Sequence, residues 1–246
     1  MNNMKKTVFT LNINYNKEIT QLTYPLLHAY AEKIGAEFYV IQERKFKHFP
    51  VTYEKLQIYE LGQQLGNDWN IFFDVDALIH PDLFDVTTHL QKDTVMHNGA
   101  DIADNRWTTD RFFMRDGRHI GSCNWFTVAS DWCIDLWKPL DDLTLSQAMA
   151  NIHPIVLERN SGVDAAHLID DYTLSRNIAK FGLKFTTMFE LKKKLGDEGN
   201  YVMHPFPVSQ EEKIQTLKQT IVNWGVTGYY PASIQAELAK LPISKS

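Results

Sequence analysis

The chain has few cysteines and no long apolar run. Only Cys123 and Cys133 occur among its 246 residues, the segment from Met1 to Lys6 is polar, and the apolar run that follows, Val8 to Ile13, is too short for a secretory leader. A disulfide-stabilised secreted scaffold is therefore excluded, and we expect both thiols to be reduced and buried. No stretch approaches the roughly 20 apolar residues that span a bilayer. We therefore expect a cytoplasmic protein without an integral membrane segment.

An excess of positive charge is also lacking. The 25 Lys and Arg residues are outnumbered by 30 Asp and Glu residues, which gives a formal net charge of -5. Clustered Lys and Arg side chains are what hold a phosphate backbone, so we expect no nucleic acid among the partners. The one basic run, Lys192-Lys193-Lys194, is short. We interpret it as a solvated loop, with a contact to substrate phosphate or to a membrane surface as the alternative.

The remaining composition is that of a folded globular protein. Hydrophobic residues make up 44% of the sequence and aromatic residues 12%, and no internal repeat, low-complexity tract or linker interrupts it. A chain of this length fits one α/β domain with a large core. We therefore expect a single domain over residues 1–246 and a single active site.

Strand-like and helix-like segments alternate in the first third of the chain. The patterns predict strand, helix, strand, helix and strand at Thr7–Ile13, Lys17–Ile34, Glu37–Gln42, Tyr53–Leu65 and Trp69–Phe73. Such alternation favours a central, mostly parallel sheet with helices on its faces, whose ligands bind beyond the carboxyl ends of the strands. Further along, we expect a strand at Asn124–Ala129, a helix at Ala165–Phe181, and a helix that begins with the Ser209/Glu212 capping box and ends near Gly225.

The strongest chemical signal follows the third predicted strand. Trp69-Asn70-Ile71-Phe72-Phe73 is apolar and ends in Asp74-Val75-Asp76. Residues two apart in extended backbone point to the same side, so the two carboxylates can converge on one cation. Oxygen ligands favour a hard ion, here Mn²⁺ or Mg²⁺, which can in turn hold a diphosphate. The alternative is a strand end whose carboxylates meet solvent.

Phe72-Phe73-Asp74-Val75-Asp76 resembles the DxD motif of GT-A-fold glycosyltransferases, in which the acidic pair holds a metal-bound nucleotide sugar. Flanking segments add to the resemblance in the same order as in that superfamily: Tyr53-Glu54-Lys55-Leu56 before the motif, then Asp76-Ala77-Leu78-Ile79-His80-Pro81, Ser122-Cys123-Asn124-Trp125-Phe126-Thr127, Asp170-Asp171 and Tyr201-Val202-Met203-His204. The resemblance implies a GT-A-like, Rossmann-like fold. It also implies a nucleotide-binding part at about residues 1–92 and an acceptor-side, metal-completing part at about 93–246.

The resemblance also assigns roles to residues. Asp74, Asp76 and His204 would hold the metal, and Val75 lies between the two acidic ligands. The donor would be a nucleoside-diphosphate sugar, with uridine diphosphate as the leaving group, and the acceptor a glycan or a small hydroxyl compound. Nucleotide-binding residues would be Lys55, Asp74, Val75, Asp76 and Asn124. Thr10 and Asn12 are added because of their position at the end of the first predicted strand, where they could contact the base.

A carboxylate near the acceptor is the remaining part of the expected site. Asp170 and Asp171 head a predicted helix, where one of them could take the acceptor proton if the reaction inverts the anomeric centre. The alternative for this pair is favourable interaction with the helix macrodipole. Trp107 and Trp125 could stack on a sugar, although packing in the core is the more usual role of aromatic residues in a protein this rich in them.

Two other functions fit parts of the pattern. Asp74-Val75-Asp76 also looks like the nucleophile loop of haloacid-dehalogenase-type phosphatases, with Asp74 as the nucleophile, although Leu78 stands where a threonine or valine is usual. A non-catalytic module that only binds a sugar nucleotide is the other alternative. It would bind the nucleotide without transferring or hydrolysing the sugar.

Overall fold

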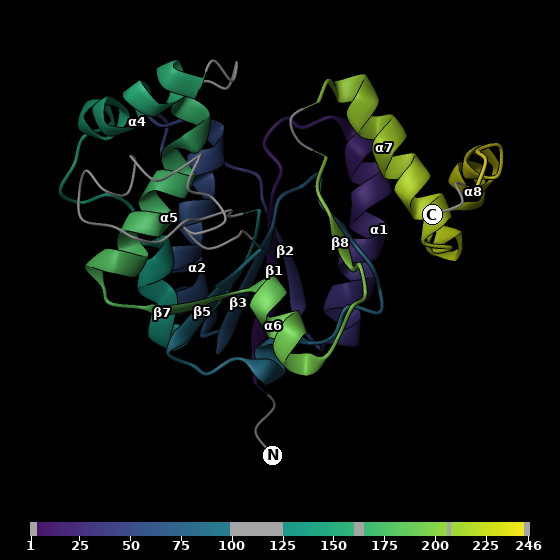
Figure 1. Ribbon diagram of the computed structural model, residues 1–246, viewed down its shortest axis with the longest axis horizontal. Helices are drawn as coiled ribbons and strands as arrows, with labels where there is room; N and C mark the ends of the chain where they lie inside the picture. The colour runs from purple at the N-terminus through teal and green to yellow at the C-terminus, as the bar shows by residue number, and fades with distance from the viewer. Residues whose placement is uncertain (1–3, 99–124, 160–164, 206–207, 244–246) are drawn as a thin grey trace.

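The computed structural model describes residues 4–98, 125–159, 165–205 and 208–243, and its centre is a six-stranded sheet (Figure 1). The strand order is β2-β1-β3-β6-β5-β7. Only β6 runs antiparallel to its neighbours. The bounds are β1 (Lys6–Leu11), β2 (Glu37–Ile41), β3 (Trp69–Phe73), β5 (Thr94–His97), β6 (Phe126–Ser130) and β7 (Lys184–Thr187). The predicted α/β class, with a mixed and mostly parallel sheet flanked by helices, is confirmed.

Helices cover both faces of this sheet (Figure 1). The α-helices are α1 (Lys17–Lys33), α2 (Ile58–Leu65), α4 (Leu145–Arg159), α5 (Ile169–Lys180), α6 (Met188–Leu195), α7 (Gln210–Asn223) and α8 (Ala232–Leu238). Short 3-10 helices are η1 (Val51–Gln57), η2 (Val86–His89), η3 (Asp131–Trp137), η4 (Ala165–Leu168) and η5 (Thr227–Tyr229). A separate two-stranded ribbon pairs β4 (Leu78–Ile79) with β8 (Val202–Met203).

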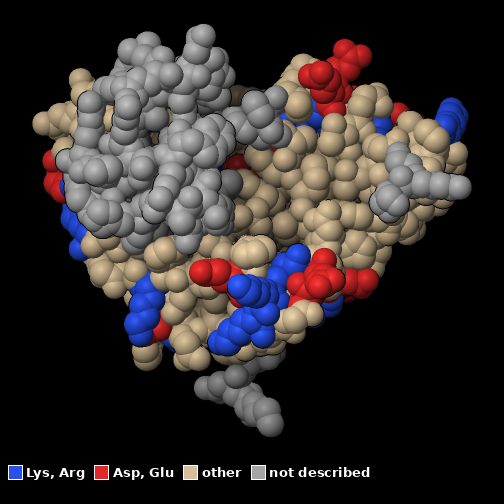
Figure 2. Space-filling view, in the orientation of Figure 1, with Lys and Arg blue, Asp and Glu red and all other residues tan. Residues whose placement is uncertain are grey.

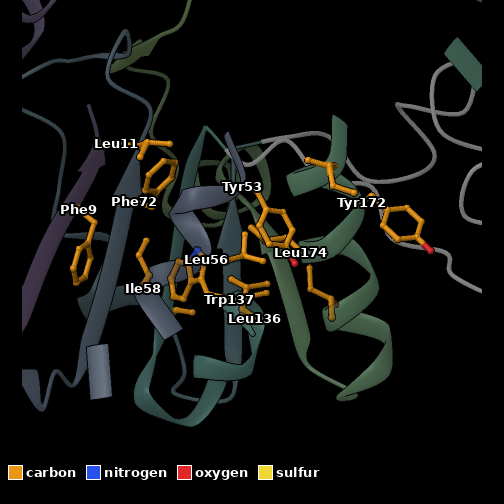
Figure 3. Close-up of a cluster of buried hydrophobic side chains, with 14 of the residues drawn as sticks. Phe9, Leu11, Tyr53, Leu56, Ile58, Phe72, Leu136, Trp137, Tyr172 and Leu174 are labelled. Atoms are coloured by element: carbon orange, nitrogen blue, oxygen red, sulfur yellow. The ribbon is translucent and has the colours of Figure 1, made fainter. Parts of the chain in front are cut away.

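The alternation of side chains along β1 and β3 divides the core between the two faces. Phe9 and Phe72 point to one face, where they pack against η1, α2, η3 and α5 (Figure 3). Val8 and Ile71 point to the other face, where they pack with α1 and α6. All four side chains are completely buried. The near-continuous apolar character of β3 follows from this burial on both faces.

Helix ends follow the expected local chemistry. The side chain of Asn16 accepts a hydrogen bond from the backbone N–H of Glu18 and begins α1, while Gly35, with a φ of 65°, follows its end. The capping box at the start of α7 forms as predicted, because Ser209 and Glu212 exchange side-chain to backbone hydrogen bonds. These ends carry their signals within a few residues, which is why the sequence located them.

The predicted single helix over Tyr53–Leu65 was wrong in its first half. The chain forms the 3-10 helix η1 up to Gln57 and becomes α-helical only at Ile58. Four consecutive residues, Tyr53 to Leu56, are buried, whereas an amphipathic α-helix buries only one stripe. Glu54 is held by backbone N–H groups of Lys45 and Phe46, so polar contacts rather than apolar periodicity shape this segment.

The basic run Lys192–Lys194 lies in the last turn of α6 and not in a loop. Its local sequence was misleading, because the preceding capping box at Thr187 and Glu190 starts a short helix that the run completes. Figure 2 shows basic and acidic side chains interleaved along the edge where α6 lies in Figure 1. Within the described ranges, no helix combines the length and the apolar character that crossing a membrane requires.

Cys133 has the predicted buried position. It is 1% exposed, and burial raises the pKa of its thiol to about 11. Such a thiol stays protonated at neutral pH and packs as a small apolar side chain. Cys123 lies outside the described residues.

Candidate active site

The two aspartates lie at the carboxyl end of β3. Strand pairing with β6 continues one step past Phe73, because the backbone N–H of Asp74 donates to the carbonyl of Trp125 at 2.8 Å. The chain then turns, with the N–H of Ala77 donating to the carbonyl of Asp74 at 3.0 Å. The hydroxyl of Thr23 on α1 donates to the carbonyl of Val75 at 2.7 Å. These bonds fix the turn from which both carboxylates project.

The ribbon of β4 and β8 brings His204 to the aspartates. Leu78 pairs with Met203 in this antiparallel ladder, so the residue after β8 lies opposite the residues before β4. The Nε2 atom of His204 is 3.1 Å from Oδ1 of Asp76 and 3.8 Å from Oδ2 of Asp74. The Trp125 ring stacks on the imidazole, with centroids 5.0 Å apart and an interplanar angle of 13°. Trp125 therefore contacts Asp74 through its backbone carbonyl and His204 through its ring.

Asp74, Asp76 and His204 have the chemistry and spacing of a metal site. Their potential ligand atoms all lie within 4.8 Å of one another. Two ligands that are each about 2.1 Å from Mg²⁺ can lie no more than about 4.2 Å apart, so a movement of less than about 1 Å closes the set on one ion. Two carboxylate oxygens and one imidazole nitrogen suit Mn²⁺ or Mg²⁺ with water and substrate oxygens as further ligands.

The second oxygen of Asp76 already has two partners. The hydroxyl of Tyr15 donates to Oδ2 at 2.8 Å, and the ammonium of Lys213 forms an ion pair with the same atom. Burial alone would raise the pKa of Asp76, but the hydrogen bond and charge of His204 and the charge of Lys213 outweigh it and lower the pKa below its usual range. Burial and the neighbouring Asp76 carboxylate raise the pKa of Tyr15, so its hydroxyl remains a donor.

Lys55 joins the end of β3 to the start of α5. Its ammonium is 3.1 Å from Oδ1 of Asp74 and 2.7 Å from Oδ2 of Asp170. Its side chain is only 2% exposed. Burial by itself would lower the pKa of Lys55, but the carboxylates of Asp170 and Asp74 raise it above the usual value. Lys55 therefore remains a cation inside the protein.

The predicted acidic pair does lie at the N-terminus of a helix. Asp170 and Asp171 occupy the first turn of α5, where the helix macrodipole favours negative charge. Asp170 is 3% exposed and is held by Lys55, whereas Asp171 is half-buried. The two neighbours therefore differ in access to solvent.

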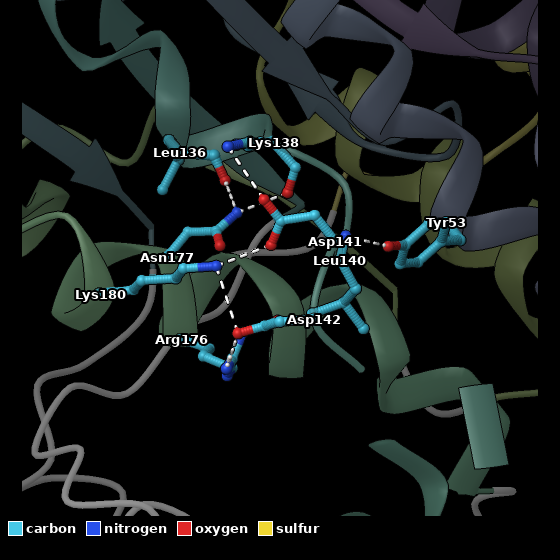
Figure 4. A network of polar contacts seen from close by, with 9 residues as sticks. All are labelled: Tyr53, Leu136, Lys138, Leu140, Asp141, Asp142, Arg176, Asn177 and Lys180. Atoms are coloured by element: carbon cyan, nitrogen blue, oxygen red, sulfur yellow. Dashed lines mark hydrogen bonds and ion pairs between the residues drawn. The ribbon is translucent and has the colours of Figure 1, made fainter. Parts of the chain in front are cut away.

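Polar contacts hold α5 against the preceding chain (Figure 4). The amide nitrogen of Asn177 donates to the carbonyls of Leu136 and Lys138 at 2.9 and 2.7 Å. On the surface, Arg176 and Lys180 form ion pairs with Asp142. The backbone N–H of Leu140 donates to the hydroxyl of Tyr53 on η1. The element that carries Asp170 is thereby fastened to the element that carries Lys55.

A cavity of about 260 Å³ opens beside Asp74, Asp76 and His204. Apolar and polar residues from both ends of the chain line it: Leu11, Ile13, Tyr15, Val51, Thr52, Asp74, Val75, Asp76, His204, Val208 and Lys213. Thr52 lines the cavity, but its hydroxyl oxygen is buried and has no hydrogen-bond partner among the described residues. A ligand in the cavity can therefore meet apolar surface, the two carboxylates and the ammonium of Lys213 together.

The residues predicted at the end of β1 lie beside this cavity but do not line it. Thr10 is completely buried in the sheet. Asn12 shapes the turn, since its amide donates to the hydroxyl of Tyr24 and its carbonyl oxygen accepts from the N–H of Tyr15. Leu11 and Ile13 line the cavity instead. The predicted residue Asn124 and the aromatic candidate Trp107 lie outside the described residues.

Tyr15 and Lys213 are the site residues that the sequence did not indicate. Lys213 contacts Asp76 across 137 positions of the chain, and no local pattern connects them. The capping box at Ser209 predicts where α7 begins, but it does not predict which residues the side chains of α7 contact. Only the packing of α7 against α1 establishes this contact.

Solved glycosyltransferases are among the structures similar to this chain. One is a glycosyltransferase involved in glycosylation of the major capsid of PBCV-1, at 10% identity and a TM-score of 0.46, covering 87% of this chain and 98% of that one. Another is the galactosyltransferase LgtC in complex with donor and acceptor sugar analogues, at 11% identity and a TM-score of 0.48, covering 96% and 97%. No protein-family model and no curated protein matches the sequence. Identities and TM-scores this low do not by themselves indicate a function.

Proposed function

We propose that the chain is a metal-dependent glycosyltransferase that moves a sugar from a nucleoside-diphosphate sugar to a hydroxyl group of a glycan or a small acceptor. The proposal treats residues 1–246 as one catalytic domain. Uridine diphosphate as the leaving group rests on the sequence resemblance alone.

The convergence of Asp74, Asp76 and His204 beside a cavity carries this proposal. The three side chains come from two distant segments, yet their ligand atoms gather at the carboxyl end of β3. Ligands of α/β proteins bind at that edge of the sheet. A group that served only to end a strand would need neither the histidine that follows β8 nor an adjoining cavity.

The cavity lining fits a nucleoside diphosphate. Leu11, Ile13 and Val51 give an apolar surface for a base and a ribose. Lys213 lies along the same cavity and suits the negative charge of the diphosphate, to which Asp74 and Asp76 would be joined through a bound metal. When bound, the metal would stabilise negative charge on the departing diphosphate.

Of the acidic pair, we assign the acceptor role to Asp171. Asp170 is buried and holds Lys55, which in turn orients Asp74. Asp171 lies at the same helix end and is more exposed than Asp170, although its Oδ1 atom is buried. In an inverting reaction Asp171 would accept the proton of the acceptor hydroxyl, and in a retaining reaction it would orient the sugar.

Calorimetric titration with nucleoside diphosphates and their sugars, in manganese and then in chelator, tests the proposal. We expect binding of one nucleotide family that requires manganese in the wild-type protein and is lost in Asp76→Asn. Asp82→Asn is the matched control, because the Asp82 side chain is 81% exposed and lies a short distance beyond the same motif. Absence of binding by the wild-type protein, together with hydrolysis of simple phosphate esters, would replace the transferase with the phosphatase. Binding without transfer or hydrolysis of the sugar would indicate a non-catalytic module.

A further inference from the structure

Both oxygens of the Asp76 carboxylate are occupied by side chains of the protein itself. Oδ1 lies beside His204, and Oδ2 accepts from Tyr15 and pairs with the ammonium of Lys213. The Asp76 side chain is 7% exposed and that of Lys213 is 12% exposed, so little water screens their attraction. A divalent cation that uses Asp76 must therefore compete with a positive charge already present.

The position of Lys213 on α7 allows it to move away. It lies in the first turns of the helix, after the capping box, and its ammonium is also 3.1 Å from the hydroxyl of Tyr15. Its side chain lines the same cavity as Val208 and Thr52. An ammonium displaced from Asp76 would stay at the cavity wall, within reach of an anion bound in the cavity.

We propose that Lys213 is an internal counter-cation that holds Asp76 in the metal-free site and couples metal binding to diphosphate binding. Metal alone displaces Lys213 and leaves a poorly hydrated ammonium without a carboxylate, which is unfavourable. A diphosphate supplies the displaced ammonium with a new anionic partner. Each ligand therefore strengthens the binding of the other by the same factor. This inference rests on the proposed function, because it takes Asp74, Asp76 and His204 as the metal ligands.

Measuring free Mn²⁺ by electron paramagnetic resonance tests the coupling without any assay of activity. Manganese chloride is titrated into wild-type protein, Lys213→Met and Lys218→Met, each with and without saturating uridine diphosphate. Lys218 is the matched control, because it is a poorly exposed lysine on the same helix whose partners, Glu18 and Glu237, lie outside the cavity lining.

We expect uridine diphosphate to strengthen manganese binding by wild-type protein and by Lys218→Met by about 5- to 150-fold, the usual range of such coupling. Lys213→Met should bind manganese alone more tightly than wild type and lose most of the nucleotide effect. Lys213→Gln, which keeps a polar group beside Asp76, should show the same change and serves if the methionine variant does not fold.

Two other outcomes would count against the idea in different ways. Equal manganese affinity of wild type and both Lys213 variants, with an undiminished nucleotide effect, would overturn the role of Lys213 and leave the metal site standing. If neither wild type nor the Lys213 variants bound manganese in either condition, the proposed function would fail, and the role of Lys213 would fail with it.

Discussion

The ammonium of Lys55 lies 2.7 Å from a carboxylate oxygen of Asp170, and the two side chains are 2% and 5% exposed. Asp74 shares the same ammonium. A buried ion pair of this kind contributes little net stability relative to apolar residues, but removal of one partner leaves an uncompensated charge. The stability of the fold therefore depends on Lys55, which also orients Asp74.

Replacement of Lys55 by methionine should destabilise the protein by about 3–5 kcal/mol, because two carboxylates lose their shared cation. Urea unfolding monitored by circular dichroism measures the loss. Lys45→Met is the control, since Lys45 and its partner Glu60 are 43% and 52% exposed, and we expect a loss below about 1 kcal/mol there. Similar losses of unfolding free energy in the two variants would show that the ion pairs of Lys55 contribute no more to stability than an exposed ion pair.

His204→Ala should weaken manganese binding by at least about 10- to 100-fold, the usual loss when only an outer partner of a metal ligand is removed, because here one of three candidate ligands themselves is lost. Isothermal titration of manganese in the presence of uridine diphosphate gives the affinity. His28→Ala serves as the control, because His28 is an exposed residue of α1. Wild-type affinity in His204→Ala would mean that the imidazole only packs against Trp125.

Asp171→Asn should lower the rate of sugar transfer by about 10²- to 10⁴-fold if the reaction is inverting, which is the usual contribution of a general base. The affinity of this variant for manganese and nucleotide should not change, because Asp171 is not one of the three candidate metal ligands, Asp74, Asp76 and His204. Steady-state transfer, measured beside the binding titration, separates the two effects. A variant that lost nucleotide binding as well would place Asp171 on the donor side.

The ion pairs of Asp141 should make stability depend on pH in the acid range. Hydrogen bonds from Lys180 and Lys138 lower the pKa of Asp141 to about 2. A carboxylate with a lowered pKa stabilises the folded state above its unfolded pKa of about 3.9, and this contribution disappears as the pH falls towards 2. The Asp141 side chain is 47% exposed, so the contribution should be no more than about 1 kcal/mol.

Comparison of wild type with Asp141→Asn in urea, between pH 7 and pH 2.5, measures this dependence. The wild-type protein should be the more stable of the two at neutral pH, and the difference should shrink below about pH 4. A difference that stayed constant over this range would show that the charge of Asp141 is not responsible.

The parts of the fold that the sequence predicted are those with local signals. The apolar run before Asp74 predicts a buried strand, and Ser209 with Glu212 predicts the start of α7. The predicted convergence of Asp74, Asp76 and His204 came from a family resemblance, because no local pattern relates positions 128 residues apart. The Tyr15 and Lys213 contacts to Asp76 depend on how α1 and α7 pack, so neither periodicity nor spacing could reveal them.

The ribbon that positions His204 is very short. Only two residue pairs join β4 and β8, with one more bond from the N–H of His80 to the carbonyl of Tyr201. Breaking so few hydrogen bonds should cost far less free energy than global unfolding, so this ribbon can open while the six-stranded sheet stays intact. Amide hydrogens in the ribbon should exchange with solvent faster than those of β3. His204 would then move away from Asp74 and Asp76 when the ribbon opens and return when it closes, while the two carboxylates stay in place at the end of β3.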